Sequence, residues 1–265
     1  VEVILFNILE NDKEKLPIIN NCDAMLHLAA QSSGPQSFFI PETDINLNVL
    51  GTLNTINLCL KNTIEKLLFA SSFVVYGDHP EKEKLDENTY CLPKSVYAGS
   101  KLAAEHLIAN FAEPNGIEWN VLRMFNVYGP GQDISKQDQG VVGIFLNMLL
   151  NGNNVDIKGS LNRFRDLIFI DDVISAWDLC LHKGKKNQIY NVGSGEKTTY
   201  NELIHNIAIA LNKERHLVIN ELENTPGDLL GCYADISKST KQLGFKPETD
   251  LLTGLNKFIN WVNNK

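Results

Sequence analysis

The stretch KLLFASSFVVY at residues 66–76, followed by Gly77, decides the fold. It is a short apolar run that ends at small and turn-forming residues, a pattern typical of a strand buried inside a sheet. Two similar runs flank it, CDAMLHLAA at 22–30 and EWNVLR at 118–123. Ligands of parallel sheets bind at the carboxyl ends of the strands. The residues that follow Leu28, Leu68 and Val121 are therefore the first places to look for a site.

Helical spacing separates these runs. Residues 43–61 and 96–111 each carry apolar side chains on one helical stripe. Strands separated by single helices predict crossover connections and a parallel sheet. We therefore expect an α/β fold with a doubly wound parallel sheet, and a smaller discontinuous α/β domain beside it. We place the first domain at 1–125 and 165–192, and the second at 126–164 and 193–265.

Other elements follow from the same patterns. We expect a buried strand at 1–8, a short helix at 13–20, a helix at 141–150 and a strand at 165–170. Asp171 or Asp172 is expected to cap the helix that contains Trp177, because short acidic side chains accept hydrogen bonds at helix N-termini. Strands at 188–192 and 216–220 and a helix at 200–211 complete the prediction.

Composition narrows the class of protein. The chain has 265 residues, of which 43% are hydrophobic, enough for a sizeable core, and 21% are charged. Its formal net charge of −8 disfavours a nucleic-acid-binding protein, and no apolar run is long enough to span a membrane. The five cysteines form no CxxC pair. We expect a reduced cytoplasmic protein without a metal site.

One pair of residues suggests catalysis. Tyr97 and Lys101 in YAGSK lie four residues apart, so a helix places them on one face. A nearby ammonium favours the phenolate, and lowering a phenol pKa by about 3 units takes about 4 kcal/mol of charge stabilisation. Such a pair suits a general base for a sugar hydroxyl, whereas the alternative is an ordinary surface tyrosine. Tyr90 and Lys94 share the spacing, but Pro93 between them disfavours the helix.

Ser71 and Ser72 end the central strand, where a hydroxyl reaches a ligand or satisfies the backbone. No GxSxG motif surrounds them, so hydrolase chemistry is not supported. The chain resembles the extended short-chain dehydrogenase/reductases, specifically the NAD-dependent epimerase/dehydratase family of nucleotide-sugar enzymes, and is most similar to UDP-hexose 4-epimerases. The resemblance runs in order along nearly the whole chain through HLAAQ (27–31), NVLGTLN (48–54), FASSFVVYG (69–77), YAGSK (97–101), RMFNVYGPGQ (123–132), FRDLIFIDDV (164–173), NVGSG (191–195) and PGDLLGCYADISK (226–238).

The resemblance implies a role for each matching residue. Ser72, Tyr97 and Lys101 would be catalytic, with Tyr97 as the base at the sugar 4-hydroxyl. Residues that would bind NAD, with NADP as the other option, are His27, Leu28, Ala29, Ala30, Asn48, Ser71, Tyr97 and Lys101. Residues that would bind the nucleotide sugar are Ser72, Asn126, Arg165 and Asp228. An arginine also suits a diphosphate on physical grounds, although Arg165 could instead pair with Asp166. The family further implies a homodimer formed by the helices at 43–61 and 96–110.

Phe73 and Val74 narrow the choice among the reactions of this family. The resemblance implies that dehydratases carry an acidic pair at these two positions and that decarboxylases carry a glutamate at the second one. Their absence favours UDP-hexose 4-epimerisation through a 4-keto intermediate. QSSGPQSF at 31–38 resembles reductases of 4-keto sugars, so an NAD(P)H-dependent reductase or a dehydratase relative is the alternative.

The beginning of the chain differs from the family. The family opens with a strand, a glycine-rich turn and a helix that bind dinucleotide phosphates, whereas this chain begins at what resembles the third strand. Gly193 and Gly195 follow a predicted strand but match the substrate half rather than a dinucleotide fingerprint. Asn7 stands where the family often has an acidic residue that contacts adenine. Thr225 stands where many members have a second phosphate-binding arginine. A non-catalytic remnant that binds a sugar nucleotide is therefore a hypothesis of another class.

Overall fold

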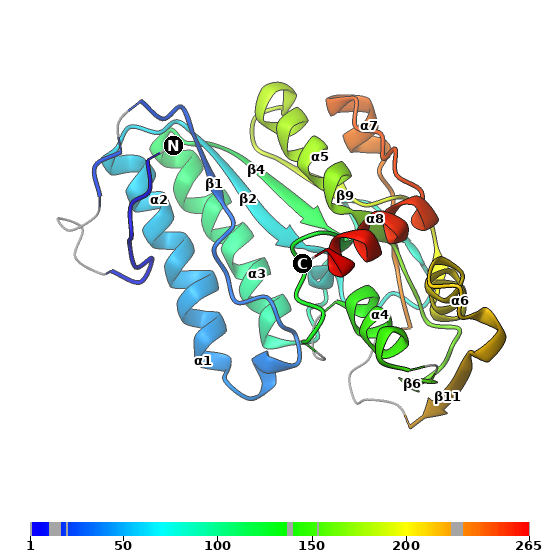
Figure 1. Cartoon of the computed structure of the whole chain (residues 1–265). Helices are drawn as coiled ribbons and strands as arrows, with labels where there is room; N and C mark the ends of the chain where they lie inside the picture. The colour runs from blue at the N-terminus through cyan, green and yellow to red at the C-terminus, as the bar shows by residue number, and fades with distance from the viewer. Residues whose placement is uncertain are drawn as a thin grey trace.

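A parallel sheet with the strand order β1–β2–β4–β9 forms the framework in the computed structural model (Figure 1). Its strands are β1 (Ala24–His27), β2 (Lys66–Ser72), β4 (Glu118–Met124) and β9 (Gln188–Val192). The structure describes residues 2–10, 17–19, 21–136, 140–152, 154–223 and 230–264. All three pairings are parallel, which confirms the predicted α/β fold.

Helices cover both faces of this sheet (Figure 1). Leu67 and Phe69 of β2 pack with α2 (Gly51–Lys61) and α3 (Val96–Leu107) in one buried cluster. Leu68 and Ala70, which alternate with them, pack with α5 (Ile170–Lys183) on the other face. Because successive side chains of a strand point to opposite faces, the unbroken apolar run of β2 serves two cores. The doubly wound arrangement is therefore confirmed.

A second core lies beside the sheet. Its members come from α4 (Val141–Asn151), α6 (Tyr200–Ala210), α8 (Leu251–Asn263), β6 (Asn154–Lys158) and β8 (Leu167–Phe169). The parallel pairs β6–β11 and β5–β8 contribute strands to this region. The structure also contains the parallel pair β3–β12 and the antiparallel pair β7–β10. The remaining elements are β3 (Lys84–Leu85), β5 (Asn126–Tyr128), β7 (Phe164–Arg165), β10 (Thr198–Thr199), β11 (Val218–Leu222), β12 (Tyr233–Ala234), α1 (Pro41–Asp44) and α7 (Ser237–Leu243).

Two of the predicted helices contain a wider turn. The helix predicted at 43–61 consists of α1, a π-helical segment at Ile45–Leu50 and then α2. The helix that begins as α3 continues as a π-helical segment at Ile108–Ala112. Such segments are often found at functional sites, because they turn side chains out of the regular helical register.

Two local predictions are corrected. The strand expected at 1–8 is wrong for residues 2–8, which are irregular, with Leu5 97% exposed, because they pair with no strand. The segment instead runs along α2, where Asn54 Nδ2 donates to the Ile8 carbonyl at 2.9 Å. The helix expected at 13–20 falls mostly outside the described residues. The strand at 165–170 is divided into β7 and β8, and Ile170 already begins α5.

The expected cap of α5 is also wrong. The helix begins directly after β8, and its N-terminal residue Phe169 provides no side-chain cap. Asp172 instead accepts hydrogen bonds from the backbone N–H groups of Glu248 and Thr249 at 2.9 and 3.2 Å. Its carboxylate therefore ties α5 to the segment that precedes α8.

Candidate active site

Tyr97 and Lys101 lie in the first turns of α3, next to the end of β2. Ser95 begins this helix, and its hydroxyl accepts the backbone N–H of Ala98 at 3.1 Å. The Lys101 ammonium is buried and donates to the Ala70 carbonyl at 2.9 Å. The same Nζ lies 4.7 Å from the centre of the Phe69 ring. The helix spacing therefore brings the predicted pair to the carboxyl end of the central strand.

Ser72 completes this group. It is the last residue of β2, and its hydroxyl accepts the backbone N–H of Val74 at 3.5 Å where a 3-10 turn begins. Its side chain lies beside the Tyr97 phenol and lowers the pKa of that phenol, so it favours the phenolate. The structure thus brings together all three residues that the sequence singled out as catalytic.

The charges of the group differ from the expectation in one respect. Burial raises the pKa of Tyr97, while Ser72 opposes the rise and Asp44 adds to it. The pKa is therefore raised, whereas the spacing from Lys101 predicts a lowered one. Burial lowers the pKa of Lys101 itself to about 8, with Glu105 and Asp44 opposing the shift. Desolvation outweighs the partner charges at both residues.

The residues predicted to bind the cofactor cluster at the end of β1. His27 is buried and its Nε2 lies 2.9 Å from the Thr52 hydroxyl. Burial and the Lys101 charge lower the pKa of His27 to about 4, so the ring is neutral at pH 7. Leu28 and Ala29 are exposed and Ala30 is half-buried. This segment therefore presents accessible apolar surface beside the catalytic group.

Asn48 joins this segment to α3 from within the π-helical turn. Its side-chain oxygen accepts the Gln31 N–H at 2.9 Å, and its amide donates to the Gln31 carbonyl at 3.2 Å. The amide also donates to the Ser100 hydroxyl at 2.8 Å, and that hydroxyl donates to the Tyr97 carbonyl at 2.8 Å. Asn48 therefore positions both the end of β1 and the turn that carries Tyr97.

Ser71 has a buried partner that the sequence did not indicate. Its hydroxyl is buried and donates to the Glu105 carboxylate, a residue that the sequence analysis did not single out. Arg123 on β4 pairs with the same carboxylate. A charged residue inside an apolar strand, and a glutamate one turn after Lys101, were the available signals.

The residues predicted to bind the substrate lie on other strands: Asn126 begins β5 and Arg165 ends β7. The Asn126 side-chain amide donates to the Asp166 carbonyl at 3.1 Å. Arg165 Nη1 donates to the Phe164 carbonyl at 2.7 Å, and its guanidinium lies 5.3 Å from the Tyr200 ring centre. Among the described residues, Arg165 and Asp166 form no ion pair with each other. The Asp166 carboxylate instead accepts hydrogen bonds from the backbone N–H groups of Ser194, Gly195 and Ala234 and from the Ser194 hydroxyl. Asp228 and Thr225 lie outside the described residues.

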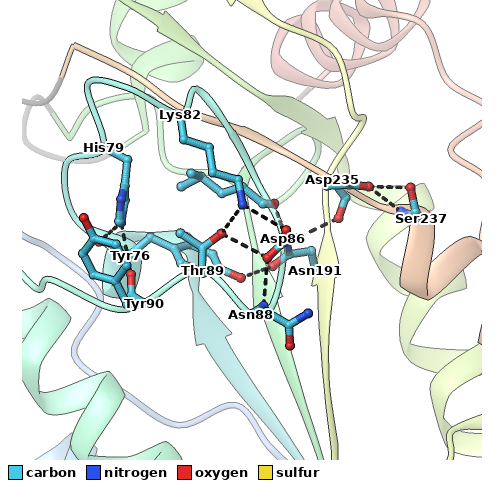
Figure 2. Close-up of polar contacts among 11 residues, drawn as sticks. Tyr76, His79, Lys82, Asp86, Asn88, Thr89, Tyr90, Asn191, Asp235 and Ser237 are labelled. Atoms are coloured by element: carbon cyan, nitrogen blue, oxygen red, sulfur yellow. Dashed lines mark hydrogen bonds and ion pairs between the residues drawn. The ribbon is translucent and has the colours of Figure 1, made fainter.

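The loop between Ser72 and Tyr97 is held by its own polar contacts (Figure 2). His79 Nε2 lies 3.1 Å from the Tyr76 carbonyl and 3.0 Å from the Tyr90 carbonyl, so it bridges the two ends of the loop. Both partners are acceptors, which requires the proton on this nitrogen. Within the loop, Lys82 Nζ donates to Asp86 at 2.9 Å and to the Thr89 hydroxyl at 3.0 Å.

Asn191 of β9 holds the same loop through hydrogen bonds of its side chain (Figure 2). It accepts the Tyr76 hydroxyl at 2.7 Å and donates to the Leu85 carbonyl at 2.9 Å. Its amide also lies 3.4 Å from the Asp235 carbonyl, beside β12. The loop that connects the predicted catalytic residues is thereby tied to both halves of the chain.

A cavity of about 410 Å³ lies apart from this group, at the turn after β5, where Gly129 to Asp133 and Gly140 line it. None of the predicted catalytic residues lines it. Within the described part of the chain, no cluster of three histidine, cysteine or acidic side chains could hold a metal ion. In the same residues no helix is long and apolar enough to cross a membrane.

The comparisons with known proteins agree with this geometry. Residues 3–193 match the model of the NAD dependent epimerase/dehydratase family. A putative UDP-glucose 4-epimerase of Methanocaldococcus jannaschii is 34% identical over 264 residues, which cover 99% of this chain and 84% of that protein. Reductases, decarboxylases and dehydratases that act on nucleotide sugars also match.

Solved structures show the same fold. The UDP-N-acetylglucosamine 4-epimerase of Methanobrevibacter ruminantium, in complex with UDP-N-acetylmuramic acid, superimposes with a TM-score of 0.90 at 31% identity over 98% of this chain and 82% of that one. The UDP-glucose 4-epimerase of Thermus thermophilus, in complex with NAD, superimposes with a TM-score of 0.83 at 33% identity over 91% and 78%.

Proposed function

This chain belongs to the NAD dependent epimerase/dehydratase family, and from that premise we propose that it epimerises the 4-hydroxyl of a UDP-hexose. The observation that carries the proposal is the meeting of Ser72, at the end of β2, with Tyr97 on α3, beside the Lys101 ammonium, which is anchored to the Ala70 carbonyl two residues before the strand end. A phenol, a hydroxyl and an ammonium at one strand end are the groups that abstraction of an alcohol proton requires. Similar proteins named as UDP-sugar 4-epimerases support the choice of reaction.

The residues present suit the nicotinamide end of NAD or NADP. The Lys101 ammonium has three N–H donors, and among the described residues only the Ala70 carbonyl accepts a hydrogen bond from it. Two donors are thus available for ribose hydroxyls. The exposed Leu28 and Ala29 would lie along the cofactor, with neutral His27 behind them. When bound, NAD supplies a hydride acceptor that takes the hydride from sugar C4 and returns it.

Proton transfer in this scheme falls to the chain's own residues. Tyr97 takes the proton of the 4-hydroxyl as the 4-keto sugar forms, and returns it after the sugar has turned its other face. Ser72 hydrogen-bonds the same oxygen and holds it beside the phenol. Lys101 stabilises the phenolate once its charge develops. Since the raised pKa of Tyr97 opposes ionisation in the chain alone, we assign the activation to the fully assembled site.

The turn after Ser72 argues against elimination or decarboxylation. Phe73 stacks on Phe125 with ring centres 5.2 Å apart, and Val74 follows it, so this turn offers no carboxylate to act as a second acid or base. Epimerisation needs none beyond Tyr97. Arg165 and Asn126, which follow the sheet end, are our proposed contacts for the diphosphate and the sugar, and Asp228 is a further one from the resemblance.

Turnover of UDP-glucose and UDP-galactose by the purified chain tests the proposal. We expect interconversion, read by proton NMR, with no net change in reduced cofactor at 340 nm. Tyr97→Phe should slow it about 10²- to 10⁴-fold, the usual contribution of a general base. Net consumption of NADH or NADPH with a 4-keto sugar would instead establish the alternative reductase. A folded chain that binds UDP-sugar without turning it over would establish the non-catalytic alternative.

We further propose a homodimer formed by the helices at 43–61 and 96–110. α2 and α3 lie side by side on one face of the sheet (Figure 1), and Ile45 and Leu50 next to them are 48% and 43% exposed. Light scattering should give twice the chain mass of 29.7 kDa. None of the five cysteines, all of them among the described residues, forms a disulfide, which supports our proposal of a reducing, cytoplasmic location. The division into two domains stays a prediction, supported by the separate core of α4, α6 and α8.

A further inference from the structure

A buried carboxylate lies directly behind the catalytic group. Glu105 on α3 and Arg123 on β4 are each 4% exposed and form a two-point ion pair. Arg123 Nε donates to Oε1 at 3.0 Å and Nη2 donates to Oε2 at 2.6 Å. The Ser71 hydroxyl donates to Oε1 from β2. One carboxylate thus joins three elements, two of which carry the proposed catalytic residues.

The position of this carboxylate relates it to both of those elements. Glu105 follows Lys101 by one helical turn on α3, so the two side chains share a face. Its partner Ser71 lies between Ala70, which accepts the Lys101 ammonium, and the proposed catalytic Ser72. Arg123 is in register with Ser71 across the β2–β4 pair. A shift of Glu105 would therefore move the helix that carries Tyr97 and Lys101 relative to the strand that carries Ser72.

Stability alone does not account for a charged pair at this place. Taking two charges out of water costs several kcal/mol per ion, and well-packed apolar residues are often at least as stable. The surroundings are apolar and aromatic: the Tyr76 ring lies 4.8 Å from the Arg123 guanidinium carbon. Leucine at position 105 together with methionine at position 123 would fill a similar volume without the desolvation cost. What an apolar residue could not supply is a fixed negative charge one turn from Lys101.

We propose that Glu105, fixed by Arg123 and Ser71, is a positioning residue that sets the charge of Lys101. The inference rests on the proposed function, because the charge of Lys101 matters only if Tyr97 acts as a base. It adds a second layer to the site, in which the Arg123 guanidinium holds Glu105 and Glu105 acts on Lys101.

The charges around Lys101 give the proposal its direction. Glu105 on the same helix and Asp44 at the end of α1 both favour the ammonium, while burial opposes it and brings the pKa of Lys101 to about 8. Neutral His27 faces it from β1, and Tyr97 precedes it on α3. Neutralising Glu105 removes one favourable charge and leaves the Arg123 cation uncompensated. Both changes lower the pKa of Lys101, so the ammonium would be lost at lower pH.

A direct titration of Lys101 tests this inference. The full chain is labelled with ¹³Cε-lysine, and the Lys101 signal is identified by its absence from Lys101→Arg. We expect a midpoint near pH 8 in the wild type and a fall of about one pH unit in Glu105→Gln. Glu113→Gln is the matched control, because Glu113 accepts the Trp119 indole N–H at 3.1 Å and so also ties this helical run to β4, but away from the site. Its Lys101 midpoint should equal that of the wild type.

Kinetics separate positioning from a purely structural role. For Glu105→Gln we expect kcat to fall about threefold near pH 7.5, as the ammonium fraction falls, and the alkaline limb of the pH profile to move with the lysine midpoint, with Glu113→Gln unchanged. If Glu105→Gln folds poorly, Glu105→Gln/Arg123→Met removes the unpaired cation as well, and its Lys101 midpoint should return part of the way toward the wild-type value. An unchanged midpoint in both folded variants overturns the inference.

The two proposals fail in different ways. A wild-type chain that converts no UDP-hexose overturns the proposed function, whatever the lysine signal does. A wild-type chain that does convert it, together with a Glu105→Gln variant of unchanged midpoint and pH profile, overturns only the role of Glu105. A loss of activity in Glu105→Gln that leaves the Lys101 midpoint in place also overturns it, because such a loss would reflect disturbed packing alone.

Discussion

At the scale of single residues, Ser72 is the group that separates a working site from a coincidental Tyr–Lys spacing. Its side chain lies beside the Tyr97 phenol and opposes the effect of burial on the pKa of that phenol. Ser72→Ala should therefore lower kcat about tenfold or more, as expected for loss of one hydrogen bond to a charge that develops during reaction. Ser237→Ala is the control, because that hydroxyl bonds Asp235 at an exposed place. Equal rates for both variants would remove Ser72 from the mechanism.

His27 predicts an acid-sensitive fold. Burial, with the Lys101 charge as the second cause, lowers its pKa from 6.5 to about 4, so the unfolded chain binds this proton more tightly than the folded one. The free energy of unfolding should therefore fall by about 3 kcal/mol as the pH falls from about 6.5 to 4. Urea unfolding measured across this range checks it. His27→Gln should flatten the dependence, whereas replacement of the exposed His106 by Gln should leave it as steep as in the wild type.

Which site residues could be predicted follows from how they are encoded. Tyr97, Lys101 and Ser72 occupy a helix face and a strand end, and regular periodicity places such residues. Glu105 and Arg123 escaped prediction, because their roles depend on pairing across α3 and β4, which no local spacing reports. The predicted lowering of the Tyr97 pKa was wrong for the same reason, since burial, which raises this pKa, depends on the whole surroundings.

At the scale of elements, the π-helical segment Ile45–Leu50 places Asn48 where a regular helix would not. Asn48 is fully buried and bonds the Gln31 backbone, Ser100 and Asp44. Asn48→Ala should lower the free energy of unfolding by about 2–4 kcal/mol, because several buried partners lose their hydrogen bonds together. NAD affinity should fall with it. Asn54→Ala, which frees only the Ile8 and Glu10 carbonyls, should cost clearly less in urea unfolding.

The elements themselves were predictable where one pattern dominates. The apolar runs of β2 and β4 and the stripes of α3 and α6 appear near their expected bounds. The strand expected at the start of the chain failed, because an apolar run becomes a strand only beside another strand, and residues 2–8 pair with none. The π-helical turns have no compositional signal, since they arise from side chains such as Asn48 that bond outside their own helix.

At the scale of the molecule, one carboxylate joins segments distant in sequence. Asp166, between β7 and β8, is fully buried and accepts the Ser194 N–H at 2.6 Å and the Gly195 and Ala234 N–H groups at 2.9 and 3.0 Å. Gly193 is required beside it, because a Cβ there would lie 2.6 Å from Asp166 Oδ2. The link holds the end of β9 and strand β12 against the proposed substrate residues Arg165 and Asn126.

Asp166→Asn should therefore loosen these segments together. The amide presents N–H groups to backbone donors, so at least one buried N–H loses its acceptor, at a cost of about 2–4 kcal/mol in unfolding free energy. Hydrogen exchange should rise at residues 193–195 and 233–235, while the β2–β4 pair stays protected. Asp156→Asn, which alters an exposed contact with Asn220 at 2.8 Å, is the control and should leave this exchange pattern unchanged. Uniform exchange across the whole sheet in Asp166→Asn would mean that the two cores unfold as one unit, and that Asp166 supports the entire fold rather than the substrate side.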